Sequence, residues 1–349
     1  MSTNRRTFIA TGAIAAATIA AGGTWWALQQ DDDAKGASSR IDLLAGAYAG
    51  PPHETMPEHF ALLTLTGGMA KNTEMELRFY DLETAPMSVP DGLTATLANL
   101  ITGEETQEIT ISSDGGVATL EQEAIRSDGW WQLRVAAGDL AASWTFLVPD
   151  PNLTGLDTPQ EPESDPDAQA LLAAALDNLI KRTSMRWWEW LSGGNGTIIL
   201  ARFSITTPAS NGLSPSFESD SLMAGRIPQD GTAAGFRDDN PRSVTIGGDA
   251  LRYTGGATPE PINPVQYLPI DQYNTTYDGY EQVQFGMSAD IDGRACQLVA
   301  FHLPGTIPAW FAFWIEVETA SLRELFMLTV NHYMHWVYYD IDEPFELSF

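Results

Sequence analysis

Two different hydrophobic patterns follow one another along the chain. From about residue 44 to 148, apolar and polar residues alternate in short runs that Gly, Pro, Asn and Asp interrupt. Alternation with a period of two places successive side chains on opposite faces of a strand, so each run predicts a half-buried strand. The runs cover residues 59–66, 74–81, 93–100, 107–112, 117–122, 130–136 and 141–148. So many short strands in one region predict an all-β sandwich.

The second pattern begins with an amphipathic helix. Asp165 suits the N-cap, and Pro166 suits the first turn. An apolar stripe at helical spacing follows, formed by Leu171, Leu172, Ala175, Leu176, Leu179 and Ile180. Strand-like runs then cover residues 185–191, 196–205, 243–246, 251–253, 280–288, 295–302, 309–317, 322–330 and 333–339. One helix followed by a long antiparallel meander predicts a curved half-barrel wrapped around that helix. The fold class is therefore mainly β.

A segment between the two patterns has a composition of its own. Residues 149–167 read PDPNLTGLDTPQEPESDPD, with five prolines, six acidic residues and no aromatic residue. Such a segment buries little apolar surface, so it predicts an interdomain linker. The predicted organisation is a signal or anchor over 1–30, a stalk over 31–43, a sandwich over 44–148, this linker, and a half-barrel over 168–349. The weakly patterned residues 206–242 and the Pro-rich residues 255–270 are predicted as flaps over the sheet.

The amino terminus predicts export. Arg5 and Arg6 precede an apolar stretch, as in a twin-arginine signal. The 24 residues from Thr7 to Gln30 carry no charge, which is long enough to span a bilayer. The segment is either cleaved near the Ala-Ala-Gly-Gly run at 20–23, or it stays as an anchor with residues 7–28 in the membrane and Trp25 and Trp26 at its outer interface. We slightly favour the anchor, so the protein is expected on the extracytoplasmic face of the cell membrane or, if the signal is cleaved, as a secreted protein.

Composition narrows the choice of partners. The chain has 46 acidic and 18 basic residues, which gives a net charge of -28, so nucleic acid is not an expected partner. Apolar residues make up 44% of the chain, which predicts folded domains rather than disorder. The single cysteine, Cys296, excludes an internal disulfide.

Two segments resemble known families. The order of EMELRFYDLETAP and SDGWWQLRVAAGDLAASWTFLVPDPN resembles the immunoglobulin-like extracytoplasmic modules of the YtkA, FixH and CopC type. The ending AWFAFWIEVETASLRELFMLTVNHYMHWVYYDIDEPFELSF resembles the last strands of the LolA and LppX-type lipoprotein-carrier fold, and MRWWEWLSGGNGTIILARFSITTP resembles its first hairpin. The second resemblance implies a concave apolar cavity that holds an acyl chain or a similar ligand and performs no chemistry.

The candidate ligand site combines the helix with aromatic strands. We expect its lining to come from Leu172, Ala175, Leu176, Leu179, Trp188, Trp190, Trp310, Trp314, Met327 and Trp336. Inward-facing residues of such a sheet either fill a core or line a cavity, and the sequence leaves both interpretations open.

A copper-handling function is the alternative. His53, Met56 and His59 lie close together in the sequence, and imidazole and thioether groups suit copper. The same residues are more typical of ordinary loop histidines and of methionines that fill a core. No cofactor is expected, and an enzyme is not expected either. The sequence has no G-x-S-x-G elbow, P-loop, G-x-G-x-x-G turn or H-E-x-x-H motif.

Overall fold

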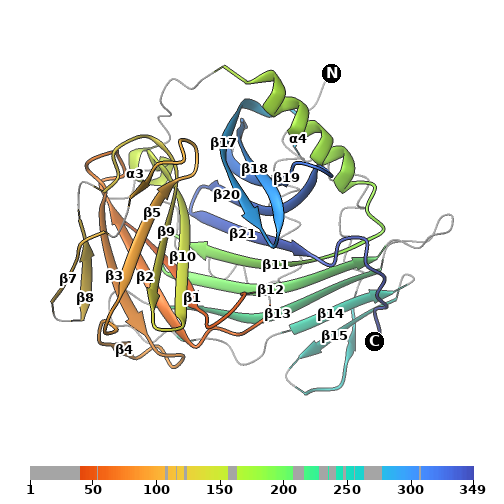
Figure 1. Ribbon diagram of the computed structural model, residues 1–349. Helices are drawn as coiled ribbons and strands as arrows, with labels where there is room; N and C mark the ends of the chain where they lie inside the picture. The colour runs from red at the N-terminus through yellow and green to blue at the C-terminus, as the bar shows by residue number, and fades with distance from the viewer. Residues whose placement is uncertain are drawn as a thin grey trace, which may run out of the picture.

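A computed structural model describes residues 40–52, 54–106, 109–114, 116–121, 124–155, 163–206, 216–227, 235, 241–246, 249–254, 256–262, 277–305 and 308–349. This part of the chain is mostly antiparallel β-sheet, arranged as a sandwich beside a half-barrel (Figure 1). Residues 1–30, most of the predicted stalk and His53 lie outside it, so the export signal and the anchor stay predictions. Within the described ranges, no helix is long and apolar enough to cross a membrane.

The N-terminal unit consists of two sheets. The first has the order β1 (Arg40–Ala47), β2 (His59–Thr66), β3 (Glu74–Tyr80), β8 (Val117–Leu120) and β7 (Ile111–Asp114), with β4 (Pro86–Met87) beside β3. The second has the order β10 (Leu140–Val148), β9 (Gly129–Ala137), β5 (Thr94–Asn99) and β6 (Glu105–Thr106). The sandwich prediction is confirmed. The strand predicted over 107–112 is wrong in its start, because among the described residues β7 begins only at Ile111.

The sandwich begins earlier in the sequence than its pattern predicts. Residues 40–43 were assigned to an exposed stalk, but they form the first half of β1, whose Asp42 side chain is fully buried. Arg40 forms an ion pair with Asp42 at 2.9 Å, and the Thr64 hydroxyl donates a hydrogen bond to the same carboxylate. A buried charge is tolerated when it is paired in this way, so the polar sequence did not reveal the strand.

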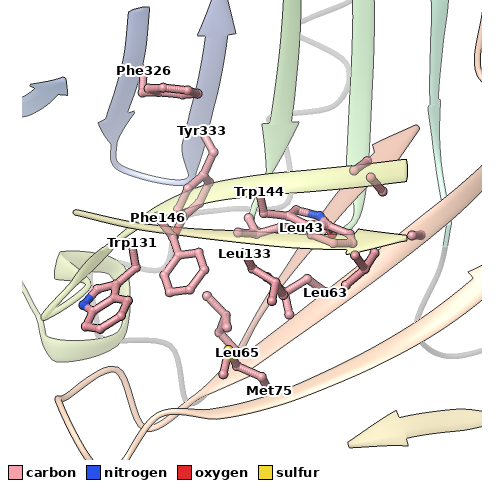
Figure 2. Packing of buried hydrophobic residues seen from close by; sticks show 14 of the residues in the cluster. Leu43, Leu63, Leu65, Met75, Trp131, Leu133, Trp144, Phe146, Phe326 and Tyr333 are labelled. Atoms are coloured by element: carbon pink, nitrogen blue, oxygen red, sulfur yellow. Dashed lines mark hydrogen bonds between the residues drawn. The ribbon is translucent and has the colours of Figure 1, made fainter. Parts of the chain in front are cut away.

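Large side chains from both sheets fill the sandwich. Leu43, Leu63 and Leu65 of the first sheet face Trp144 and Phe146 of the second (Figure 2). The indole N–H of Trp144 donates to the carbonyl of Leu43 at 3.0 Å, which satisfies its one polar group. Each such buried side chain contributes about 1.5–3 kcal/mol of transfer free energy, so this core holds the two sheets together.

The C-terminal unit is one sheet of eleven strands. Its order is β16 (Glu260–Pro261), β15 (Asp249–Thr254), β14 (Pro241–Ile246), β13 (Ser216–Arg226), β12 (Thr197–Thr206), β11 (Ser184–Gly193), β21 (His332–Tyr339), β20 (Ser321–Thr329), β19 (Ala309–Glu316), β18 (Arg294–Leu303) and β17 (Glu281–Ile291). The half-barrel is confirmed, but it is not a single meander, because the last strand β21 pairs with the first strand β11. Two meanders therefore meet at that pair.

One long strand of this sheet was missed. β13 lies within the residues predicted as a flap, and it alternates buried and half-buried positions over much of its length. Ser219 and Ser221 occupy buried positions of this strand. Serine at buried positions hides the apolar period on which the sequence prediction depends.

The helix α4 (Pro166–Leu179) forms as predicted. The Asp165 side chain accepts hydrogen bonds from the backbone N–H groups of Asp167 and Ala168, at 2.8 and 3.2 Å. The stripe that includes Leu172 and Leu176 is buried, and α4 packs against β17, β19 and β20 (Figure 1). We call the sheet face that carries α4 the inner face, and the opposite one the outer face.

The sandwich packs against the outer face. β1 contacts β11 and β12, and β10 contacts β20 and β21. Asp42 N–H donates to Gly194 O at 2.8 Å, Gly196 N–H donates to Asp42 O at 2.9 Å, and Leu44 N–H donates to Ser192 Oγ at 2.9 Å. The two units are therefore joined by backbone hydrogen bonds as well as by the linker.

The start of the predicted linker belongs to this interface. α3 (Pro151–Thr154) follows Asp150, which is buried and caps the helix by accepting from Asn152 N–H at 2.8 Å. The Tyr333 hydroxyl of the half-barrel donates to Asp150 Oδ2 at 2.8 Å. Figure 2 shows Tyr333 reaching toward Phe146 of the sandwich. These residues are packed rather than exposed. The cap on α3 gives hydrogen-bond partners to backbone N–H groups at the start of the turn, which would otherwise need water, so this part of the segment can be buried.

Candidate functional site

The inner face of the half-barrel carries a continuous apolar surface. Strand register places one residue from each of six adjacent strands in a row, and all six are buried: Phe301, Phe311, Met327, Met334, Leu191 and Ile199. We call this set the apolar row. α4 packs against the β17–β20 arm, at one end of the row, whereas Leu191 and Ile199 lie on β11 and β12 at the other end.

Aromatic rings line the β11–β13 arm of the same face. Trp187 stacks on Phe203 with ring centroids 4.9 Å apart. Trp336, Tyr338 and Phe217 surround Trp187 at centroid distances of 6.2, 6.3 and 6.4 Å. Rings in tilted and stacked contact form a rigid apolar wall, because few side-chain torsions are free to change.

A buried carboxyl interrupts this apolar surface. Glu189 lies between Trp187 and Leu191 on the inner side of β11, and only 3% of it is exposed. It pairs in register with Trp336 on one side and with Ala201 on the other. Burial raises the pKa of Glu189 to about 8, although the nearby indole N–H of Trp336 lowers it somewhat. The group is therefore mostly a neutral acid at pH 7.

The predicted ligand-site residues divide between the two faces. Six of them belong to the inner face and pack in one cluster: Leu172, Ala175, Leu176, Leu179, Met327 and Trp336. The other four lie on the outer face and pack with the sandwich core: Trp188, Trp190, Trp310 and Trp314. Their placement at the inner-face site was wrong. Neighbouring residues of a strand point to opposite faces, so a run such as Trp187-Trp188 cannot put both rings on one surface.

The outer-face tryptophans take part in the contact between the two units. Trp188 meets Tyr48 of the sandwich edge to face at 6.3 Å, and it meets His335 at 5.7 Å. Phe326 stacks on His335 at 4.4 Å. These rings pack between the outer face and the sandwich, so they help to hold the two units together.

The predicted site also lacks several residues of the inner face. Glu189 and Leu191 were not in the predicted site, and neither were Phe203, Phe217 and Tyr338. A signal for Glu189 was available, since a lone acid in the run WWEWL shares its parity with Trp187 and Leu191. Phe203 and Phe217 become neighbours of Trp187 only through strand pairing.

The copper alternative gains no support. His53 lies outside the described residues, Met56 is 44% exposed, and His59 lies at the start of β2. His59 lines an apolar cavity of about 180 Å³ at the end of the sandwich, together with residues such as Phe79, Leu93 and Leu140. Over the described ranges, no three His, Cys, Asp or Glu residues are grouped so that they could hold a metal ion.

A second cavity lies on the outer face and is polar. It has a volume of about 250 Å³ and is lined by Arg186, Arg202, Ser204, Glu218, Asp220 and Tyr339. Arg186 is paired with Asp340 at 2.8 Å, and Glu218 is paired with Arg242 at 2.5 Å. Because acids and bases balance here, this cavity selects no ligand charge.

No protein-family model matches the chain. No curated protein matches it either. Among solved structures, LprF from Mycobacterium bovis is similar to 54% of this chain over 98% of its own, with 12% identity and a TM-score of 0.40. The lipoprotein LppX from Mycobacterium tuberculosis is similar to 53% of this chain over 100% of its own, with 13% identity and a TM-score of 0.39. A putative outer membrane lipoprotein-sorting protein domain from Vibrio parahaemolyticus covers 51% of this chain and 95% of its own, with 10% identity and a TM-score of 0.22. Values this low do not establish a family or a function.

The inner face defines what this site can do chemically. Its surface is apolar and aromatic, and the polar group at its centre is an acid that burial holds neutral. Apolar contact is the main interaction that such a surface offers to a ligand.

Proposed function

We propose that the inner face of the half-barrel binds an acyl chain or a similar apolar ligand, and that the protein performs no chemistry on it. The observation that carries the proposal is the apolar row, which crosses six strands while α4 packs at one end of it. In this proposal the ligand chain packs against the end of the row formed by Leu191 and Ile199. Each buried CH₂ group contributes about 0.8 kcal/mol, so even a medium-length chain gains enough to offset the cost of association.

The sandwich has a structural part in this proposal. It covers the outer face of β11, β12, β20 and β21, and these strands bear four of the six residues of the apolar row. A sheet held from outside keeps its curvature, so the sandwich preserves the shape of the ligand face. With residues 7–28 as an anchor, the ligand face would be held on the extracytoplasmic side of a membrane.

The test uses diphenylhexatriene, a hydrocarbon probe that fluoresces in apolar surroundings. We expect saturable binding at about one probe per chain. Two small inner-face residues provide matched variants: Ala201 lies on β12 beside Glu189, and Ala175 lies on α4. Ala201→Trp is expected to abolish probe binding with little change in stability, because the ring would occupy the ligand's place. Ala175→Trp is expected to cost about 1–3 kcal/mol, because it overpacks the contact between helix and sheet.

Two results would contradict the proposal. One is the absence of saturable probe binding to the intact chain. The other is an equal loss of stability in the two alanine variants, which would show that the inner face is a filled core along its whole length.

A further inference from the structure

The polar cavity on the outer face is lined by two charged side chains that have no partner. Arg186 and Glu218 of its lining are occupied, because each forms an ion pair with a residue outside the lining. Arg202 and Asp220 differ, since neither side chain forms an ion pair or a hydrogen bond with any residue of the described ranges. The Nε atom of Arg202 is also shielded from water. A partly buried charge without a partner is unfavourable, so a ligand that supplies the opposite charge would stabilise it.

Strand register places these two charges side by side. Arg202 on β12 pairs with Asp220 on the adjacent strand β13, so both side chains leave the same face of the sheet (Figure 1). Adjacent strands lie about 4.8 Å apart, so a ligand only a few atoms across can reach both groups. Burial raises the pKa of Asp220, and the charge of Glu218 raises it further. The charges of Arg242 and Arg202 lower this pKa, but by less. A positive ligand group beside Asp220 would favour its ionised form.

Packed contacts hold the lining of the cavity in place. Trp188 is the register neighbour of Arg202 on β11, and it contacts Tyr48 of the sandwich with ring centroids 6.3 Å apart. The guanidinium of Arg186 lies over the ring of Phe345 in the C-terminal segment, 4.2 Å from its centroid. The cavity has a volume of about 250 Å³. One water molecule needs only about 10–15 Å³, so there is room for a small polar molecule.

The charges of the lining restrict the class of ligand. Acids and bases balance in number, so the cavity favours neither an anion nor a cation by its net charge. A ligand with a single charge would pair with Arg202 or with Asp220 and leave the other group unpaired. A ligand with both charges satisfies both groups. An α-amino acid carries its ammonium and its carboxylate on one carbon atom, and a guanidinium binds a carboxylate through two parallel hydrogen bonds. The hydroxyl-bearing residues Ser204 and Tyr339 complete the polar lining.

We propose that this cavity binds a small zwitterion of the class of a free α-amino acid, with the ligand carboxylate on Arg202 and the ligand ammonium on Asp220. Binding pairs the two charged groups that have no partner in the ligand-free cavity. The site lies on the outer face of the sheet, whereas the apolar row lies on the inner face. It therefore does not depend on the proposed acyl ligand.

The experiment compares three compounds that share one amide chain, by isothermal titration calorimetry of the full chain at pH 7. L-glutamine carries both charges, 4-carbamoylbutanoate lacks the ammonium, and 4-aminobutanamide lacks the carboxylate. We expect L-glutamine to bind at about one molecule per chain. It should bind at least about tenfold more tightly than either of the other two, because each of them loses one charge-assisted hydrogen bond.

Variants assign each ligand charge to its residue. Arg202→Gln is expected to bind L-glutamine no more tightly than 4-aminobutanamide, because the carboxylate has lost its partner. Asp220→Asn is expected to bind L-glutamine no more tightly than 4-carbamoylbutanoate, because the ammonium has lost its partner. Arg134→Gln and Asp139→Asn are the matched controls, since both residues are exposed on the sandwich. They should keep the preference of the unmodified protein. Thermal unfolding of each variant shows that it is folded.

Three results would overturn this inference. The first is the absence of saturable binding, at millimolar concentration, of both L-glutamine and glycine, which is the smallest amino acid. The second is equal binding of L-glutamine and either singly charged compound by the unmodified protein, because one of the two charges would then be unused. The third is a preference for L-glutamine that survives in Arg202→Gln and Asp220→Asn. Diphenylhexatriene tests the inner face separately, so failure of either proposal leaves the other in place.

Discussion

At the scale of single residues, the buried acids of this protein differ in how they are satisfied. Glu316 is buried, which works to raise its pKa, but the hydrogen bond and charge of Arg323 bring that pKa below the ordinary value. Asp150 has the hydroxyl of Tyr333 and a helix N-terminus as donors, and burial still raises its pKa to about 6. Among the described residues, Glu189 has the indole N–H of Trp336 as its one hydrogen-bond donor, so its pKa rises furthest. Of these three acids, Glu189 is therefore the one whose protonation depends most on how well its surroundings shield it from water.

Glu189 makes the stability of the protein depend on pH. A carboxyl whose pKa rises from 4.5 in the unfolded chain to about 8 in the folded one binds its proton more tightly when folded. Its contribution is therefore fully present below pH 4.5 and is lost as the pH rises through 8. We expect the free energy of unfolding to fall by roughly 1–2 kcal/mol between pH 6 and 7.5. Asp150, whose pKa is about 6, adds a smaller decline at the lower end of this range.

Urea unfolding at several pH values measures this effect. Glu189→Gln should flatten the decline and be more stable than the unmodified protein at pH 7.5. The exposed Glu260→Gln on β16 serves as the control and should keep the decline. A decline of equal size in Glu189→Gln would show that another group causes it.

At the scale of elements, the faces of the strands decide which function a side chain serves. β11 carries Trp187 and Glu189 toward the ligand face, and Trp188 and Trp190 toward the sandwich. A strand between two packed layers is apolar on both sides, so its composition does not distinguish the faces. The sandwich also contacts the middle of β17, where Met287 N–H donates to Leu100 O at 2.7 Å.

Gly286 permits that close approach. A Cβ atom at this position would lie 2.4 Å from the backbone oxygen of Leu100 and 2.5 Å from Leu298 Cδ2, so either backbone or core would have to shift. We expect Gly286→Ala to destabilise the protein by about 1–3 kcal/mol in chemical unfolding. Gly50→Ala is the control, since its Cβ would meet only Thr55 Cγ2, at an ordinary 3.7 Å. Equal stability of the two variants would mean that the two units do not meet as closely as described.

At the scale of the whole molecule, the two units behave as one body. Hydrophobic side chains of the sandwich and of the outer face form a single buried cluster. Backbone hydrogen bonds join β1 to the turn at Gly194 and Gly196, and the Asp150–Tyr333 contact lies at a second place. Such an interface does not depend on the covalent linker.

Limited proteolysis distinguishes a docked pair from two tethered domains. The acid- and proline-rich composition of residues 156–164 predicts the first cut there. We expect the two fragments to elute together in size-exclusion chromatography after the cut and to separate only in denaturant. Separate elution under native conditions would contradict the docked arrangement, and a first cut within residues 185–205 would contradict the domain boundary.

The local sequence determined those features that depend on neighbouring residues. Asp165 and Pro166 begin α4, and the apolar stripe through Leu172 and Leu176 is the face that it buries. Alternation of apolar and polar residues located most of the strands. Capping and periodicity act over a few residues, so the local sequence is enough to predict them. Only the tertiary structure decided what strand pairing brings together. The neighbours of Glu189, which are Trp336 and Ala201, come from β21 and β12. The pairing of β11 with β21 connects residues about 150 positions apart, and no local pattern encodes such a register.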